Sequence, residues 1–359
     1  MHSLAMISLK HIFHRASSEQ PSLFWRWFVQ HESRYRLQQW SSRDFLDAAM
    51  VQLRYYDPWI KVMLGPEKDG CLELIVTADG DLAFFARVFE LVKAAPTLEG
   101  WSIVALKQAI GMEKISIEIN EWVFNSDTMQ FYAEEDERFP DEVSLVLTHG
   151  GYSTQHDDLF QTGGMLYLES ALGELDAVVT IDRYRVGPDR PDRTPLISLA
   201  KLPDYLLWRE KEVSGKYEEP PPDLPHEKWR IVEAEDAGGM PMLAAFNKAY
   251  SDWPFRPCYP WLVVIEIHFR GRKDGLPDPH QWIDLQQIED EMMVLLSAQQ
   301  VLLLGHKTYN KARIIYTYAR DYLAASVLLH DYRRRSNRPY EFAFYITRDK
   351  YWQAAAGFF

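Results

Sequence analysis

The sequence predicts an α+β fold divided into two domains. Short apolar runs typical of strands alternate with helical patterns, and short turns between many of the runs favour antiparallel pairing. Three consecutive prolines interrupt this order within residues 216–228, and prolines favour an extended linker because they lack a backbone donor. We therefore expect an acidic α+β domain over 1–215, a proline-rich linker over 216–228 and a second α+β domain over 229–359.

Charge is distributed unevenly between these parts. The whole chain has a formal net charge of -13. Residues 229–359 contain 16 Lys+Arg and 15 Asp+Glu, so residues 1–228 carry 23 against 37, a balance of -14. Because such a negative domain repels phosphate backbones, we expect no direct nucleic-acid binding there.

The two cysteines and the apolar runs indicate the compartment. Cys71 and Cys258 lie far apart in or beside apolar runs, so we expect reduced, buried thiols and no disulfide framework. Residues 1–12 are apolar only in patches and lack a cleavage signal, and no run approaches the roughly 20 apolar residues of a membrane span. We expect a cytoplasmic protein that does not associate with membranes.

In the first domain, helices are predicted from apolar stripes and capping signals, and strands from apolar runs between turn residues. The predicted helices cover 21–30, a segment from 42 with Ser41 and Asp44 as a capping pair, 158–172 and a short segment from 203. Another helix is predicted after Asp81, through Phe85, Val88, Phe89 and Val92, and is stopped by Pro96. The predicted strands cover 59–64, 71–77, 101–106, 115–119, 143–147 and 177–184. The first two strands are separated by turn residues and are expected to form a hairpin.

The second domain gives clearer signals. A hairpin is predicted around the turn sequence 236–239, and the near-continuous apolar run 261–269 is typical of a strand buried on both faces. The remaining predicted elements are a helix from Pro279, strands at 301–306 and 312–318, a helix at 321–334 and a strand at 340–346. After the hairpin, this order is β-α-β-β-α-β, which predicts a ferredoxin-like antiparallel sheet with two helices on one face.

Several short segments of the second domain carry a family resemblance. They are PWLVVIEI (260–267), DGLPD (274–278), IED (288–290), GHKT (305–308) and RIIYTY (313–318). Together they resemble the bacterial domain of unknown function six-nine-five, over roughly residues 229–359. TADG (77–80) and AAPTLEGW (94–101) are similar to the uncharacterised region found upstream in such proteins.

The resemblance implies a fold and a bacterial source, but no catalytic residue, because that family has no assigned activity. A more distant likeness, in topology, is to the regulator of ribonuclease activity B, a small ferredoxin-like protein that binds and inhibits its enzyme. That likeness implies a regulatory role exercised by binding.

His149, His156 and Asp157 are the best set of metal-type ligands in the chain. Two imidazoles and a carboxylate suit a divalent transition metal. The alternative is a glycine turn that leads into a helix, whose first turn favours Asp157 and Asp158. Asp79 and Asp81, which flank a glycine, likewise fit either a cation site or a strand-to-helix turn.

Arg333, Arg334, Arg335 and Arg338 form the sharpest cluster of charge. Cations at the end of a helix complement its negative pole, and this alone can explain them. The functional interpretation is a docking patch for an acidic protein, for RNA phosphate or for the acidic first domain of the same chain. Of these partners, RNA is disfavoured because the domain lacks an ordered basic-aromatic signature.

Two groups of carboxylates lie in the second domain. Glu289, Asp290 and Glu291 follow one another on a helix, where consecutive residues point about 100° apart, so we expect a solvated face. Glu266 interrupts an apolar strand and is expected either to face solvent or to pair with a cation such as Arg313 or His268.

No motif pairs a nucleophile with a base, and no cofactor motif is present. We therefore expect a cofactor-free, non-catalytic binding or regulatory module that acts through protein contacts, or through docking between its own domains. The alternative is a metal-dependent hydrolase that uses His149, His156 and Asp157.

Overall fold

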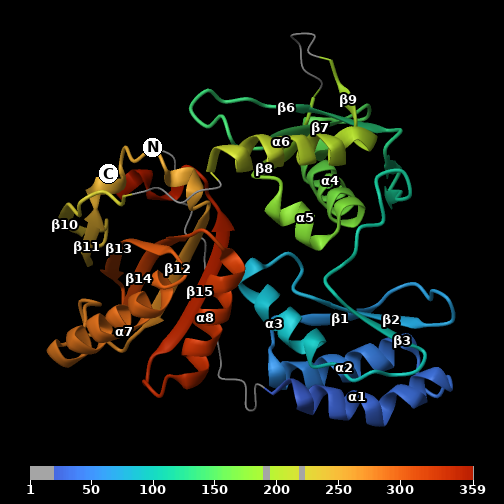
Figure 1. Cartoon of the computed structure of the whole chain (residues 1–359), viewed down its shortest axis with the longest axis horizontal. Helices are drawn as coiled ribbons and strands as arrows, with labels where there is room; N and C mark the ends of the chain where they lie inside the picture. Colours follow the sequence, from blue (N-terminus) through green and yellow to red (C-terminus); the bar gives the residue numbers. More distant parts are fainter. Residues whose placement is uncertain (1–19, 189–194, 218–222, 359) are drawn as a thin grey trace. The chain divides into compact units, whose positions relative to one another are not determined.

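The computed structural model describes residues 20–188, 195–217 and 223–358 (Figure 1). Its described residues form two compact units, one containing 20–80 and 87–217 and the other 81–86 and 223–358. The predicted linker starts inside a helix, since α6 runs to Tyr217. Residues 1–12, for which the sequence analysis expects no cleavage signal, lie outside the described residues.

The first unit begins with two helices, α1 (Pro21–Arg36) and α2 (Ser42–Tyr56). Ser41 caps α2 as predicted, because its side chain accepts a hydrogen bond from Asp44 N. Buried rings of the two helices, including Phe28 and Phe45, pack at 5.1–6.0 Å on Trp101.

The first sheet of this unit contains both pairing directions. Its order is β1-β2-β3, formed by β1 (Lys61–Leu64), β2 (Leu72–Thr77) and β3 (Trp101–Ala105). The β1–β2 hairpin is antiparallel as predicted, whereas β2 and β3 are parallel. Helix α3 (Leu82–Lys93) connects them, since parallel neighbours need a crossover.

The second sheet of this unit has the order β8-β7-β6-β9, with β7 and β8 parallel. Its strands are β6 (Met129–Ala133), β7 (Ser144–His149), β8 (Arg183–Gly187) and β9 (Ile197–Ser198), and a separate hairpin joins β4 (Ile117–Ile119) to β5 (Trp122–Phe124). The helices of this region are α4 (Asp157–Leu172), α5 (Glu174–Val179) and α6 (Leu202–Tyr217). The strands and helices of this region share one apolar core, and its buried members include Phe131, Leu147, Phe160 and Leu206.

The strand predicted at 177–184 is wrong in its first part. Gly173 ends α4 with a φ of 84°, and the chain starts a new helix, α5, at Glu174. Acidic residues favour a helical first turn, and Glu174 and Asp176 lie in the first turn of α5. The strand itself is only β8, from Arg183 to Gly187.

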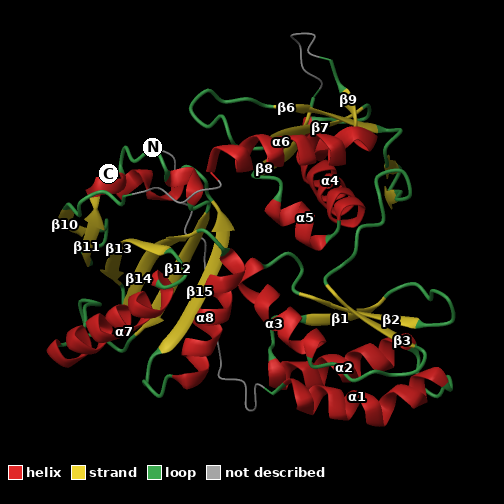
Figure 2. Cartoon of the chain, in the orientation of Figure 1, coloured by secondary structure: helices red, strands yellow, loops and turns green. Residues whose placement is uncertain are grey.

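The C-terminal unit is one six-stranded antiparallel sheet with the order β10-β11-β13-β14-β12-β15 and two helices (Figure 2). The strands are β10 (Trp229–Glu235), β11 (Pro241–Asn247), β12 (Trp261–His268), β13 (Val301–Tyr309), β14 (Ala312–Ala319) and β15 (Glu341–Arg348). The helices are α7 (Pro279–Ser297), which Asp278 begins with a capping box, and α8 (Tyr322–Arg335). The predicted hairpin and the β-α-β-β-α-β succession of elements are both present.

Both helices pack on the same face of this sheet. His306 hydrogen-bonds to Glu289 of α7, and the centroid of the Phe344 ring lies 5.0 Å from that of the His330 ring of α8. His306 and Phe344 share a face because Ile315 and Ile265 connect them in one cross-strand row. We call the opposite face, which carries Lys307 and its neighbours, the distal face.

No helix among the described residues has both the length and the apolarity needed to cross a bilayer.

Candidate functional site

The predicted arginine cluster lies beside a groove between the two helices of the C-terminal unit. Arg333–Arg335 form the last turn of α8, and Arg338 follows it. The groove has a volume of about 370 Å³. Its lining includes Glu291, Leu295, Leu328, Tyr332, Arg335 and Arg338, and we call it the α7–α8 groove.

The arginines do not form a uniform cationic patch. Arg338 pairs with Glu291 at 2.5 Å, and this hydrogen bond raises the pKa of the guanidinium. Asp331 pairs with Arg334 and, at 3.7 Å, with Arg335. Of the three arginines in these pairs, Arg335 is the most accessible, with 82% of its side chain exposed.

Apolar side chains of α7 and α8 are exposed, and one of them, Leu295, lines the α7–α8 groove. Val294 and Ile283 on α7 are 72% and 58% exposed, and Leu295 and Val327 are also exposed. Val294 and Val327 are the sequence neighbours of Leu295 and Leu328, which line the groove. Exposed apolar side chains that cluster around a hollow are typical of a protein-binding surface.

The structure does not assemble His149, His156 and Asp157 into a metal site. His149 Nδ1 accepts from Gly151 N at 3.0 Å, so Nε2 carries the proton and donates to Val123 O, also at 3.0 Å. The Asp157 carboxylate accepts from Tyr152 and Gln161, which lowers its pKa. Within the described ranges, no three His, Cys, Asp or Glu side chains come close enough to hold a metal ion.

Contacts within the chain account for the turn at Asp79. Asp79 lies in the left-handed region with a φ of 51° and pairs with Lys61 at 2.5 Å and with Lys107 at 2.8 Å. These lysines hold the pKa of Asp79 below its ordinary value despite partial burial. The strand-to-helix turn therefore explains this sequence.

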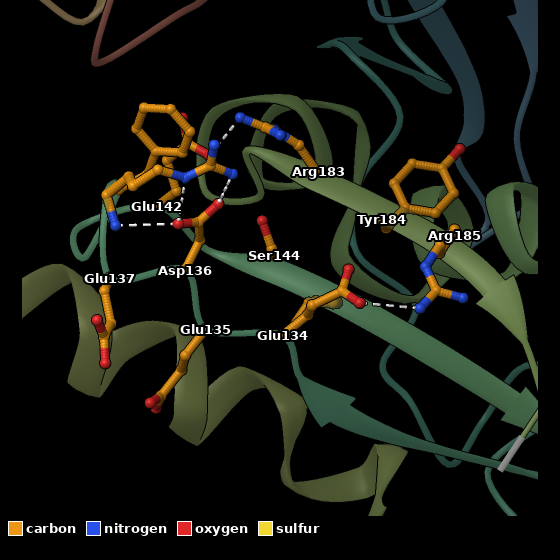
Figure 3. A pocket seen from close by; sticks show the side chains of 12 residues that line it. Glu134, Glu135, Asp136, Glu137, Glu142, Ser144, Arg183, Tyr184 and Arg185 are labelled. Atoms are coloured by element: carbon orange, nitrogen blue, oxygen red, sulfur yellow. Dashed lines mark hydrogen bonds and ion pairs between the residues drawn. The ribbon is translucent and has the colours of Figure 1, made fainter. Parts of the chain in front are cut away.

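A second groove, of about 630 Å³, lies in the first unit beside the starts of β7 and β8 (Figure 3). Its three arginines are neutralised from within the chain. Arg183 pairs with Glu142 at 2.7 Å, Arg185 with Glu134 at 2.9 Å and Arg138 with Asp136 at 2.6 Å. The Phe139 ring lies under Arg138 and Arg183. Because these charges are matched in pairs, the groove presents no isolated guanidinium to a ligand.

The Arg138–Asp136 pair of this groove predicts an unusual titration. Two hydrogen bonds from the Arg138 side chain, and one from its backbone, lower the pKa of Asp136 to about 2. We expect carboxyl-carbon NMR to show this value in the wild type. In Arg138→Gln, the pKa is expected to rise toward 3.8 without reaching it, because the backbone hydrogen bond remains. An equal pKa in both proteins would contradict the pairing.

The sequence analysis did not predict a buried ionic cluster between α7 and the strands β13 and β14. Glu289 was expected on a solvated face, but it is 3% exposed and accepts from His306 Nδ1 and Arg313 Nη1, both at 2.8 Å. Arg313 also donates from Nε to Thr308 Oγ1 at 2.9 Å. Glu266 pairs with His268 at 3.0 Å, and pairing with His268 is one of the predicted alternatives.

It also missed a fully buried carboxylate in the first unit. Glu174 Oε1 accepts from Ala78 N and Gly80 N, both at 3.0 Å. Its Oε2 accepts from Thr77 Oγ1 at 2.6 Å and from Lys107 N at 3.0 Å. The Glu174 carboxylate thus accepts hydrogen bonds from backbone N–H groups just after the parallel strands β2 and β3.

The two grooves and the buried clusters are the basis for any assignment of function. No family model, no curated protein and no solved structure matches this chain.

Proposed function

We propose that this chain is a non-catalytic binding or regulatory module, and that its C-terminal unit binds a protein partner in the α7–α8 groove. The observation that carries the proposal is the exposed apolar surface at this groove: Leu295, which lines it, is 43% exposed, and Val294, next to Leu295 in the sequence, is 72% exposed. Monomeric proteins rarely expose such a cluster without a use for it.

We also infer a ferredoxin-like plan for this unit. The strands β15-β12-β14-β13 are adjacent in that order, and α7 and α8 connect them. In this plan both helices cover one face, so their outer sides stay available for a partner. We also propose that this unit resembles the domain of unknown function six-nine-five, and that resemblance implies the same plan.

The groove favours one kind of partner segment. Leu295 and Leu328 offer an apolar floor, and the Arg335 guanidinium lies on the rim with most of its surface exposed. A segment that inserts one large apolar side chain and places a carboxylate next to it would match both features. We therefore assign the groove to a protein segment with an apolar residue beside Asp or Glu.

Site-specific cross-linking tests this assignment. A photoreactive amino acid at Val294 should capture the partner in the source cell, and mass spectrometry should locate the cross-link in an apolar segment that contains a carboxylate. The partner segment, made as a peptide, should then bind the purified full chain in a fluorescence anisotropy titration.

Two variants connect the binding to the groove. Leu295→Glu combined with Arg335→Glu should weaken the peptide by roughly 30-fold or more, because the loss of a central contact costs about 2 kcal/mol or more. Val51→Glu changes an exposed apolar residue of α2, 50% exposed against 43% for Leu295, and should leave binding unchanged. Equal affinity in the wild type and the groove variant would overturn the assignment, and cross-links only to this chain would replace the partner by a second copy.

A further inference from the structure

The outermost strand of the C-terminal sheet, β10, has a free edge. It lies at one end of the strand order (Figure 1), and no strand among the described residues pairs with its outer side. Its 7 residues pair with β11 in one continuous register without a bulge. The strand contains no proline, which would remove a donor from the edge. A long and regular edge of this kind is a template for another strand.

Hydrogen bonds of the β10–β11 hairpin show which groups of β10 face outward. Asp236 N donates to Met240 O at 3.0 Å, and Lys248 N donates to Lys228 O at 2.8 Å. Because the bonding direction alternates along an antiparallel strand, the even-numbered residues of β10 face β11. The odd-numbered residues therefore turn their backbone N–H and C=O groups to the free edge. They are Trp229, Ile231, Glu233 and Glu235.

Apolar side chains lie along the same edge. Ile231 is 76% exposed and Trp229 is 43% exposed. Register places Ile231 in one cross-strand row with His306, on the face that the helices cover. It places Val232 in a row with Lys307, on the distal face. A strand added at this edge would remove apolar surface from water on both faces.

The charges of β10 and its flanks favour a second copy of the same strand. The first part is basic, with Lys228 and Arg230, and the last part is acidic, with Glu233, Glu235 and Asp236. An antiparallel neighbour with this sequence lays its acidic part beside the basic part of the first copy. A parallel neighbour would lay like charges side by side. The pattern therefore selects an antiparallel second copy.

We propose that two copies of this chain pair through their β10 strands, antiparallel and about a two-fold axis at Val232, so that the two sheets continue into each other. This inference is independent of the α7–α8 groove. The contact uses the same surface on both copies, as two-fold dimers do. Residues at equal distances on either side of Val232 then lie opposite each other.

This register uses every outward-facing backbone group of the strand. Ile231 lies opposite Glu233 of the second copy, and each pair of this kind exchanges two hydrogen bonds. Trp229 lies opposite Glu235 in the same way. An axis at Ile231 or at Glu233 would leave one of these four residues opposite a position outside the strand. With the axis at Val232, no two like charges lie directly opposite each other.

Sedimentation velocity of the full-length protein at about 100 µM tests the pairing, since small interfaces are weak. We expect a species with twice the mass of the chain. Ile231→Glu places a carboxylate opposite Glu233 of the second copy, twice in each dimer, and should raise the dissociation constant roughly tenfold or more. Val294→Glu, at an α7 residue that is 72% exposed, is the matched control and should leave the dimer intact.

A second variant separates lost pairing from lost folding. Glu233→Lys added to Ile231→Glu puts opposite charges across the two-fold axis and should restore the dimer. A monomeric wild type would overturn the proposal. A dimer that Val294→Glu dissociates and Ile231→Glu does not would overturn it as well, because the contact would then lie on α7.

Disulfide trapping tests the register. At the axis, the two Val232 residues form a non-hydrogen-bonded pair with Cα atoms about 4.5 Å apart, which a disulfide can span. Val232→Cys should therefore link two chains under mild oxidation. Ala234→Cys should not, because its two copies lie roughly 14 Å apart. Cys71 is only partly buried, so both variants carry Cys71→Ser. Failure of Val232→Cys to link, or equal linking by Ala234→Cys, would overturn this register.

Discussion

Replacing Arg313 by methionine is expected to lower the free energy of unfolding of the C-terminal unit by about 3–5 kcal/mol, because it leaves a buried carboxylate without its permanent cation. Glu289 is 3% exposed, and Arg313 is 1% exposed. The guanidinium also lies 5.2 Å from the centroid of the Trp282 ring, so the variant loses a packing contact as well. Urea denaturation followed by tryptophan fluorescence measures the change.

A matched double variant separates the ion pair from the packing. Glu289→Leu with Arg313→Met removes both charges and keeps most of the buried volume. We expect this protein to recover most of the lost stability, since a buried pair and an apolar replacement of similar size are often close in free energy. A double variant as unstable as Arg313→Met, or a single variant within about 1 kcal/mol of the wild type, would contradict the cluster.

The same cluster predicts how stability depends on acid. Burial raises the pKa of Glu289, but His306 and Arg313 outweigh this effect and hold the pKa below its ordinary value of 4.5. The folded state therefore binds the proton more weakly than the unfolded state, and the contribution to stability is present above pH 4.5 and is lost as pH falls below it. Glu289→Gln should remove this part of the acid dependence, and urea midpoints between pH 3 and pH 6 measure it.

Periodicity was sufficient for the order of elements in the C-terminal unit. The strands and helices between 261 and 348 have strong signals of period 2 or 3.6 with capping residues such as Asp278, and each is where these signals predict it. The register adds what a single strand cannot show: which strands are neighbours, and that Arg313 faces α7.

Glu289 was within reach of the same reasoning. It lies four residues after Leu285 and three before Met292, both buried, so the helical period places it on the apolar stripe. Reading 289–291 as one acidic run hid this position. Arg313 carries a similar signal, since it alternates with Ile315 and Thr317 on a buried face.

Other features of the sites depend on contacts between distant parts of the chain. Glu174 and Thr77 are 97 residues apart, and nothing local to either predicts their hydrogen bond. His149 was considered a ligand because of its type, whereas its position between two backbone groups decides its role.

Glu174→Gln is expected to destabilise the first unit by about 2–4 kcal/mol, because the substitution breaks a buried, charge-assisted set of hydrogen bonds. Each carboxylate oxygen accepts from two donors, Oε1 from Ala78 N and Gly80 N and Oε2 from Thr77 Oγ1 and Lys107 N. An amide has one oxygen, so in either orientation its NH₂ group faces two of these donors. The variant keeps the size of the side chain, and the loss therefore reports on the acceptors alone.

Hydrogen exchange locates this loss within the unit. The amides of Ala78, Gly80 and Lys107 all donate to the Glu174 carboxylate, so they should lose protection together in Glu174→Gln. The control is Glu169→Gln, which removes a partly exposed partner of Lys107 Nζ and should cost about 1 kcal/mol or less without exposing these amides. If both variants lose the same protection, the exposed pairs around Lys107, rather than the buried carboxylate, hold the ends of β2 and β3 together.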